Sequence, residues 1–262
     1  MPQPLRRVGR GRFPTAPRLH CQPHTYTTST LEQPAMPAPA KTVLFDLDNT
    51  LTDHIGTLNQ WAEMYHQRCP QVPVSWLLDA ERRWAGQRAH FFSDLRNTFG
   101  IEESVLSLMA DYRQYTATHV PYRPEVCDAL AELDREGWRM GLVTNGEATA
   151  QRQKLHRARL DRFFPRGLAI SSEVGLRKPD KGLFLYALED LGTQGVPALV
   201  VGDDLGADVQ GALNAGLLPV WVSAGRSLGP TDPRPIHTAH TVVDAIEWLR
   251  TTAAQEFLAT AA

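Results

Sequence analysis

The chain has 262 residues, of which 42% are apolar and 21% are charged, and its formal net charge is −2. This composition is ordinary for a globular protein, and the length suits one large α/β domain or a core with a smaller inserted domain. The small net charge argues against nucleic acid or an anionic membrane surface as a partner. The sequence also has no apolar run long enough to span a membrane.

The cysteines and histidines show no metal-binding pattern. The three cysteines, Cys21, Cys69 and Cys127, lie far apart and form no Cys-x-x-Cys pair. The nine histidines form no His-Glu-x-x-His pattern. We therefore expect neither a disulfide framework nor a zinc site, and this cysteine usage fits a reducing, cytoplasmic location.

Residues 1–40 differ from the rest of the chain. They hold several arginines, one acidic residue (Glu32) and repeated prolines, without hydrophobic periodicity. Such a segment buries too little apolar surface to offset the entropy of ordering, so we predict a disordered N-terminal tail. Two other interpretations stay open. An arginine-rich, acid-poor start is typical of organellar transit peptides, although prolines disfavour their amphipathic helix. Alternatively, Met36 is the true start of translation.

From residue 41 onward, short apolar segments alternate with helical patterns. The segment 42–46 (TVLFD) is apolar and partly β-branched, which is typical of a buried strand. Further along the chain, the patterns predict a helix at 124–136, a strand at 138–144, a helix at 147–160, a strand at 168–171, a helix at 180–191, a strand at 198–203, a helix at 206–215, a strand at 218–223 and a helix at 242–250. This alternation predicts an α/β fold with a doubly wound, Rossmann-like parallel sheet.

Residues 54–123 interrupt the alternation with helical patterns alone. The expected helices cover 56–68, 75–84, 86–98 and 103–118. The insertion is too long for a loop, so we predict an α-helical cap domain at 54–123 within a core formed by 41–53 and 124–262.

Aromatic and basic side chains of this insertion allow two interpretations. The aromatic residues form either the core of the small domain or a surface that stacks on a ring of the substrate; they are Trp61, Trp76, Trp84, Phe91, Phe92 and Phe99. Arg88 and Arg96 either contact a substrate anion or belong to a solvated helix face.

Polar side chains gather where the predicted strands end. The carboxyl ends of parallel strands meet at one edge of the sheet, where ligands bind. The residues that the predicted topology brings to this edge are Asp46, Asp48, Thr144, Asn145, Gly146, Lys178, Asp203, Asp204 and Asp208. Carboxylates that repel one another bind Mg²⁺ well, and a lysine and a hydroxyl beside the metal suit a phosphate group. A carboxylate can attack phosphorus when such neighbours neutralise the phosphate oxygens.

Four segments of the chain resemble the four motifs of the haloacid dehalogenase (HAD) superfamily. They are FDLDNTLTD, VTNG, SSEVGLRKPD and VGDDLGADVQGALNAGL, in the order of the family and within about residues 42–222. The resemblance implies a phosphatase fold with a helical C1 cap inserted after the first motif. A cap of this kind favours small substrates over folded proteins.

The resemblance also implies a role for each matched residue. Asp46 is expected to be the nucleophile that forms an aspartyl-phosphate. Asp48 is expected to protonate the leaving oxygen, to activate water afterwards, and to bind Mg²⁺ through its carbonyl oxygen. Thr144 is expected to bind the phosphoryl group, together with the backbone of Asn145 and Gly146.

The third and fourth motifs supply the remaining charges. Lys178 is expected to neutralise the phosphate and to steady Asp46. Asp203 is expected to be a metal ligand, and Asp208 a direct or indirect one. Asp204 lies between these two positions and can also be read as a helix cap.

The presence of Asp48 favours a phosphatase, because family members that displace halide from carbon usually have another residue at this position. We therefore expect Mg²⁺-dependent hydrolysis of a small phosphorylated metabolite, such as a nucleotide, sugar or glycolate phosphate, by a monomer or small homo-oligomer. The alternatives are a phosphomutase or dehalogenase of the same fold, or a HAD-like binding protein without turnover. The sequence does not identify the substrate.

Overall fold

The computed structural model describes residues 41–84 and 86–260, which belong to one compact unit. The predicted tail at residues 1–40 lies outside the described residues. Within the described ranges, no helix combines the length and apolar character that a membrane span requires.

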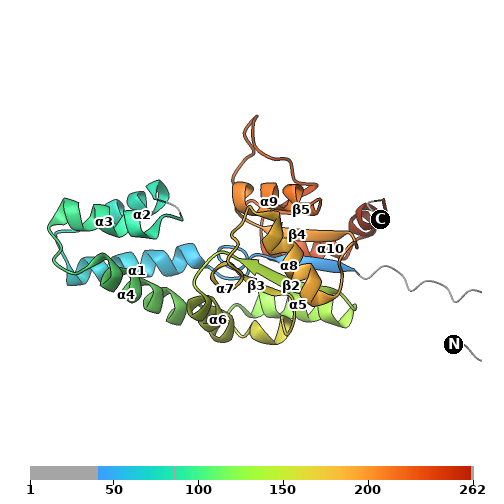
Figure 1. Cartoon of the computed structure of the whole chain (residues 1–262), viewed down its shortest axis with the longest axis horizontal. Helices are drawn as coiled ribbons and strands as arrows, with labels where there is room; N and C mark the ends of the chain where they lie inside the picture. Colours follow the sequence, from blue (N-terminus) through green and yellow to red (C-terminus); the bar gives the residue numbers. More distant parts are fainter. Residues whose placement is uncertain (1–40, 85, 261–262) are drawn as a thin grey trace, which may run out of the picture. The chain divides into compact units, whose positions relative to one another are not determined.

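A six-stranded parallel sheet organises the protein, with the strand order β3-β2-β1-β4-β5-β6 (Figure 1). The strands are β1 (Thr42–Phe45), β2 (Arg139–Thr144), β3 (Leu168–Ile170), β4 (Ala198–Gly202), β5 (Leu218–Val222) and β6 (His237–Ala239). β1 lies at the centre, paired with β2 on one side and β4 on the other. The strand order reverses there, as the predicted doubly wound fold requires, and the fold prediction is confirmed.

Helices cover both faces of this sheet. Because successive side chains of a strand point to opposite faces, Phe45 and Leu44 enter different hydrophobic clusters. Phe45 packs in the cluster that α5 and α10 cover, and Leu44 packs in the cluster beneath α8 and α9. The helices of the core are α5 (Pro124–Arg135), α6 (Ala148–Arg157), α7 (Ser171–Val174), α8 (Lys181–Leu191), α9 (Gln210–Asn214), α10 (Val242–Leu249) and α11 (Thr252–Thr260).

Several elements depart from the sequence prediction, among them the short helix α7, which was not predicted. β6 was not predicted, because its three residues are short of apolar character and only Ala239 is buried. α11 was not predicted either; it begins three residues after α10 ends. The helix expected at 206–215 is instead one turn of π-helix at Leu205–Val209 followed by α9.

Four helices fill the insertion between β1 and α5, as predicted. They are α1 (His54–Arg68), α2 (Val74–Arg83), α3 (Arg88–Phe99) and α4 (Val105–Thr118), and they lie grouped together (Figure 1). They share a hydrophobic cluster of their own, in which Trp61 packs edge-on against Phe92 and Tyr112. Trp61, Phe91 and Phe92 are fully buried in it, so these aromatics form the core of the cap. The exact domain boundaries stay a prediction.

Trp61→Ala is expected to destabilise the cap by about 3–5 kcal/mol, because it leaves a cavity in the centre of this cluster. Urea denaturation followed by circular dichroism measures the change. Leu106→Ala is the matched control, since Leu106 is 78% exposed on α4. Equal stability of the two variants would contradict a separate cap core.

Candidate active site

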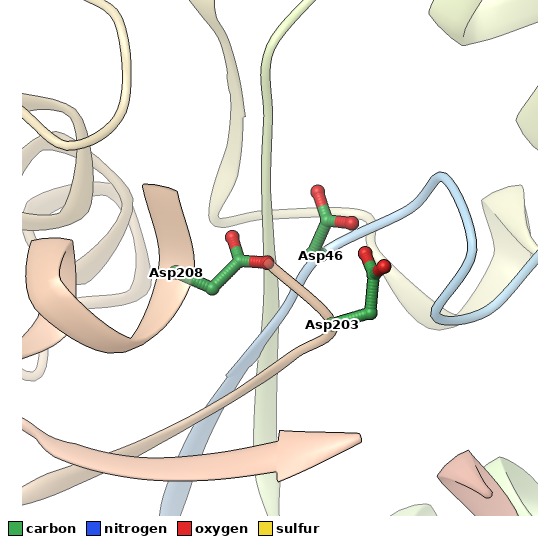
Figure 2. Close-up of side chains that lie close together, drawn as sticks. All are labelled: Asp46, Asp203 and Asp208. Atoms are coloured by element: carbon green, nitrogen blue, oxygen red, sulfur yellow. The ribbon is translucent and has the colours of Figure 1, made fainter. Parts of the chain in front are cut away.

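Three carboxylates meet at the carboxyl end of the central strands. Asp46 directly follows β1, Asp203 directly follows β4, and Asp208 lies in the π-helical turn after it. One oxygen of each lies within 4.8 Å of the others, and Figure 2 shows the three side chains together. Because β1 and β4 are neighbours in the sheet, the topology brings together side chains that lie up to 162 positions apart in the sequence, Asp46 and Asp208.

Lys178 joins two of these three carboxylates, Asp46 and Asp208. Its Nζ donates to Asp46 Oδ1 at 2.5 Å, to Asp208 Oδ1 at 2.6 Å and to the carbonyl oxygen of Val143 at 2.8 Å. The three acceptors use all three N–H bonds of the ammonium group. Its side chain is only 3% exposed, so the ammonium group is fixed at one point beside Asp46.

Asn145 fixes the backbone of Lys178. Its Oδ1 accepts from the Lys178 N–H at 2.9 Å, and its Nδ2 donates to the Lys178 carbonyl oxygen at 3.1 Å. The N–H of Gly146 donates to Ser171 Oγ at 2.9 Å. The side chain of Asn145 thus positions the lysine, a contact that the sequence prediction did not contain. The predicted backbone contacts of Asn145 and Gly146 with phosphate stay a prediction.

The buried charges of this cluster do not balance. Burial raises the pKa of the Asp46 carboxyl well above its usual value, and Asp208 and Asp203 raise it further against the opposing effect of Lys178. Burial, and then Asp208, raise the pKa of Asp203 to about 7, although Arg226 lies 3.3 Å from its Oδ2. Burial would lower the pKa of Lys178, but Asp208 and Asp46 raise it. The cluster thus holds three carboxylates, and the positive charge beside them is too small to balance them. Mg²⁺ prefers hard oxygen donors of this kind.

Asp204 and Asp208 have different surroundings, although only three residues separate them. Asp204 Oδ1 accepts from the N–H groups of Gly206 and Ala207, both at 2.8 Å, so this side chain caps the π-helical turn. Asp208 turns back toward β4, where a Cβ on Gly202 would lie 2.3 Å from its carboxyl carbon. Glycine at position 202 therefore gives Asp208 the room to reach Lys178. Asp204 lies outside the carboxylate cluster.

Asp48 points to a different set of partners. Lys154 Nζ donates to its two carboxylate oxygens at 2.8 and 2.7 Å, and Gln151 Nε2 donates to Oδ2 at 3.2 Å. Burial would raise the pKa of Asp48, but Lys154 and then His54 lower it far below its usual value. In this structure Asp48 is therefore a carboxylate held by a buried ammonium group.

Gln151 links Asp48 to Thr144. The same Nε2 donates to Thr144 Oγ1 at 2.7 Å, and both side chains are buried. A Cβ on Gly146 would lie 2.7 Å from Gln151 Cδ, so glycine there leaves space for the glutamine. The sequence analysis missed Gln151 and Lys154. Their spacing of three residues on α6, which places both on one face of the helix, was the only available signal.

A cleft of about 620 Å³ opens beside Asp48. Residues of α3 and α4 line it from the cap, and residues of α6 line it from the core. α4 packs against α6, and Arg157 Nε donates to the carbonyl oxygen of Thr118 at 3.2 Å. His54, at the start of α1, lies 3.9 Å from Asp48 and contacts the hydroxyl of Tyr112 through Nε2 at 3.3 Å. Cap and core side chains thus meet next to Asp48.

Comparison with known proteins points to one family. The model of the haloacid dehalogenase-like hydrolases matches residues 40–216. A glyceraldehyde 3-phosphate phosphatase of Methanopyrus kandleri is 38% identical over 71% of this chain and 85% of its own length. A phosphoserine phosphatase of Thermus thermophilus is 39% identical over 60% of this chain and 62% of its own length.

A solved structure has the same fold. The magnesium-bound HAD-hydrolase YfnB of Bacillus subtilis matches 82% of this chain and 100% of its own with a TM-score of 0.69 and 22% identity.

Asp203→Asn is expected to raise the melting temperature of the metal-free protein at pH 8. The folded pKa of about 7 lies above the unfolded value of 3.8, so the ionised carboxylate destabilises the fold increasingly between these pH values and fully above pH 7. Each kcal/mol that the asparagine relieves corresponds to about 2–4 °C in a chain of this size. Thermal denaturation in EDTA, at pH 8 and at pH 3.5, measures the difference, which should vanish at the lower pH.

The same variant is expected to lose most of the stabilisation that Mg²⁺ gives to the wild-type protein, because a ligand that binds the folded state raises its melting temperature. Asp204→Asn is the matched control: it removes a neighbouring charge, keeps a capping side chain and leaves the carboxylate cluster intact. A wild-type Mg²⁺ response in Asp203→Asn would contradict the proposed metal site.

Proposed function

This chain belongs to the haloacid dehalogenase-like hydrolases, and we propose that its phosphatase reaction passes through a phospho-aspartate formed on Asp46. It is a hydrolase of small phosphomonoesters, as its phosphatase relatives indicate. The observation that carries the proposal is the buried cluster in which Lys178 holds Asp46 beside Asp203 and Asp208.

The cluster suits attack by a carboxylate on phosphorus. Lys178 holds Oδ1 of Asp46, which leaves Oδ2 to attack. Asp46, Asp203 and Asp208 would hold Mg²⁺, which neutralises phosphoryl oxygens when it is bound. Lys178 supplies fixed positive charge to the same oxygens, and the hydroxyl of Thr144 at the end of β2 adds a donor.

Two half-reactions complete the turnover. Asp46 forms a bond to phosphorus while the bond to the leaving oxygen breaks. Asp48 delivers to that oxygen a proton that it has first taken up, from solvent or from the water split in the preceding turnover. Asp48 then takes a proton from water, the water oxygen attacks the phospho-aspartate, and inorganic phosphate leaves as Asp46 is restored. The ion pair with Lys154 favours the ionised form of Asp48, which is the form that activates water.

The relatives favour hydrolysis over the other reactions of this fold. The curated relatives reported above are phosphatases. The solved dehalogenases and the β-phosphoglucomutase with similar structures are less than 25% identical and share only the fold. We propose a small phosphorylated metabolite as the substrate and Mg²⁺ as the metal.

Asp46→Asn is expected to abolish Mg²⁺-dependent hydrolysis of p-nitrophenyl phosphate, because the amide keeps the shape of the side chain but not its nucleophilicity. Phosphate release measures the loss, and the melting temperature checks the fold. Asp204→Asn, outside the cluster, is the control and should remain active. Near wild-type turnover by Asp46→Asn would contradict the proposal.

Lys154→Met is expected to lower kcat by about 10- to 100-fold with little change in KM, because it leaves Asp48 without its positioning partner. The methionine keeps an unbranched apolar side chain of similar length and removes the charge. Lys181→Met, on the exposed start of α8, is the matched control. Steady-state kinetics on an alkyl phosphate make the comparison. Wild-type kcat in Lys154→Met would show that Lys154 does not support Asp48.

A further inference from the structure

The cleft beside Asp48 is the space into which a leaving group must extend. Under the proposed function, Asp48 delivers its proton to the leaving oxygen, and Asp48 lines this cleft. Its volume of about 620 Å³ lies in the range of small-molecule sites. The charged groups that line it therefore face the part of the substrate that differs from one phosphomonoester to another.

Most of these charged groups already have partners. Asp48 is paired with Lys154 at 2.7 Å. Arg88, only 21% exposed, forms a two-pronged ion pair with Glu81, and its guanidinium group lies 4.4 Å from the centre of the Tyr112 ring. Glu81 and Tyr112, both in the cap, are thus the partners of the Arg88 guanidinium group.

Glu147, at the start of α6, is a further carboxylate of the cleft. It accepts from the N–H groups of Thr149 and Ala150 at 3.1 and 2.9 Å, so it caps its own helix. These two backbone donors satisfy its oxygens and hold it at the edge of the core.

Two arginines of the cleft remain without such partners. Arg113 comes from α4 of the cap, and Arg177 comes from the core loop immediately before Lys178. Neither guanidinium group forms a hydrogen bond or ion pair with a residue in the described part of the chain. Arg113 interacts with Glu147 only at longer range. The cleft therefore keeps an excess of positive charge on its cap and core walls.

Arg177 spans the distance between core and cap. An ideal Cβ on Gly86, in the loop before α3, would lie 2.9 Å from Arg177 Nη2. Gly86 has a φ of +72° and no side chain, so the guanidinium group can lie directly against the cap backbone. Arg177 thus lies next in sequence to the lysine of the phosphate site, and it reaches the wall of the cleft on the opposite side.

We propose that Arg113 and Arg177 bind a carboxylate on the leaving group, so that the preferred substrates are carboxylated phosphomonoesters. This inference rests on the proposed function. A guanidinium group presents a planar pair of donors that matches a carboxylate, and two such groups from opposite walls can hold one between them. The leaving group then bridges cap and core while its phosphate lies at Asp46 and Lys178.

Matched substrates test the proposal. O-Phosphoserine and phosphoethanolamine differ only by a carboxylate, and 3-phosphoglycerate and glycerol 3-phosphate differ by a carboxylate in place of a hydroxymethyl group. The wild-type kcat/KM is expected to favour the carboxylated member of at least one pair by about tenfold or more, as one charge-assisted hydrogen bond provides. Arg113→Met and Arg177→Met should each lower this preference several-fold. In the double variant, the ratio of the kcat/KM values for the two members of a pair should approach one.

Arg82→Met is the matched control, because Arg82 is an exposed arginine of α2 whose ion pair with Asp79 lies outside the cleft. This variant should keep the wild-type preference, and melting temperatures confirm that each variant is folded. A wild-type enzyme that treats both members of each pair alike, or a preference that survives in the double variant, would overturn the inference. Failure of the proposed function itself would appear separately, as p-nitrophenyl phosphate hydrolysis that persists in Asp46→Asn.

Discussion

Lys178 and its three hydrogen bonds determine the geometry of the whole site. Its ammonium group joins the loop after β1, the end of β2 and the turn after β4 through Asp46, Val143 and Asp208. One buried cation does not neutralise the neighbouring carboxylates, which is why burial and mutual repulsion raise the pKa values of Asp46 and Asp203. A divalent cation would neutralise this residual negative charge and, together with Lys178, would offer positive charge to the oxygens of a phosphate group.

Cap and core meet at the second carboxylate of the first motif. Asp48 is held by Lys154 of α6, and α6 in turn packs against α4 of the cap. His54 connects Asp48 to Tyr112 of the same cap helix. The side chain that would handle protons therefore lies where cleft-lining residues of the cap join the core, separate from the carboxylates that would hold the metal.

The sequence predicted those parts of the site that depend on strand ends. Asp46, Lys178 and Asp208 could be placed together because each belongs to a short motif after or near a parallel strand, and parallel strands deliver such motifs to one edge. Local patterns also predicted the four cap helices and the central strands, the helices from their helical patterns and the strands from short apolar runs. β6 was missed because an edge strand of three residues has almost no such pattern.

The sequence could not predict contacts between side chains of distant segments. The ion pair of Lys154 with Asp48 joins residues 106 positions apart, and no local pattern specifies it. The sequence favoured Asp208 over Asp204 as a member of the cluster, but it did not show the physical reason: a turn of π-helix and the missing side chain of Gly202 decide which of the two reaches Lys178. The lysine of the third motif was predicted, but its backbone support by the Asn145 side chain was not.

The most direct measurement is the identity of the phosphorylated residue during turnover. The protein is mixed with a saturating phosphomonoester and Mg²⁺, quenched in acid and digested, and the peptides are analysed by mass spectrometry. The account predicts one phosphoryl group on the peptide that contains Asp46, sensitive to hydroxylamine as an acyl phosphate must be. A phosphoryl group on another residue during steady turnover would contradict it.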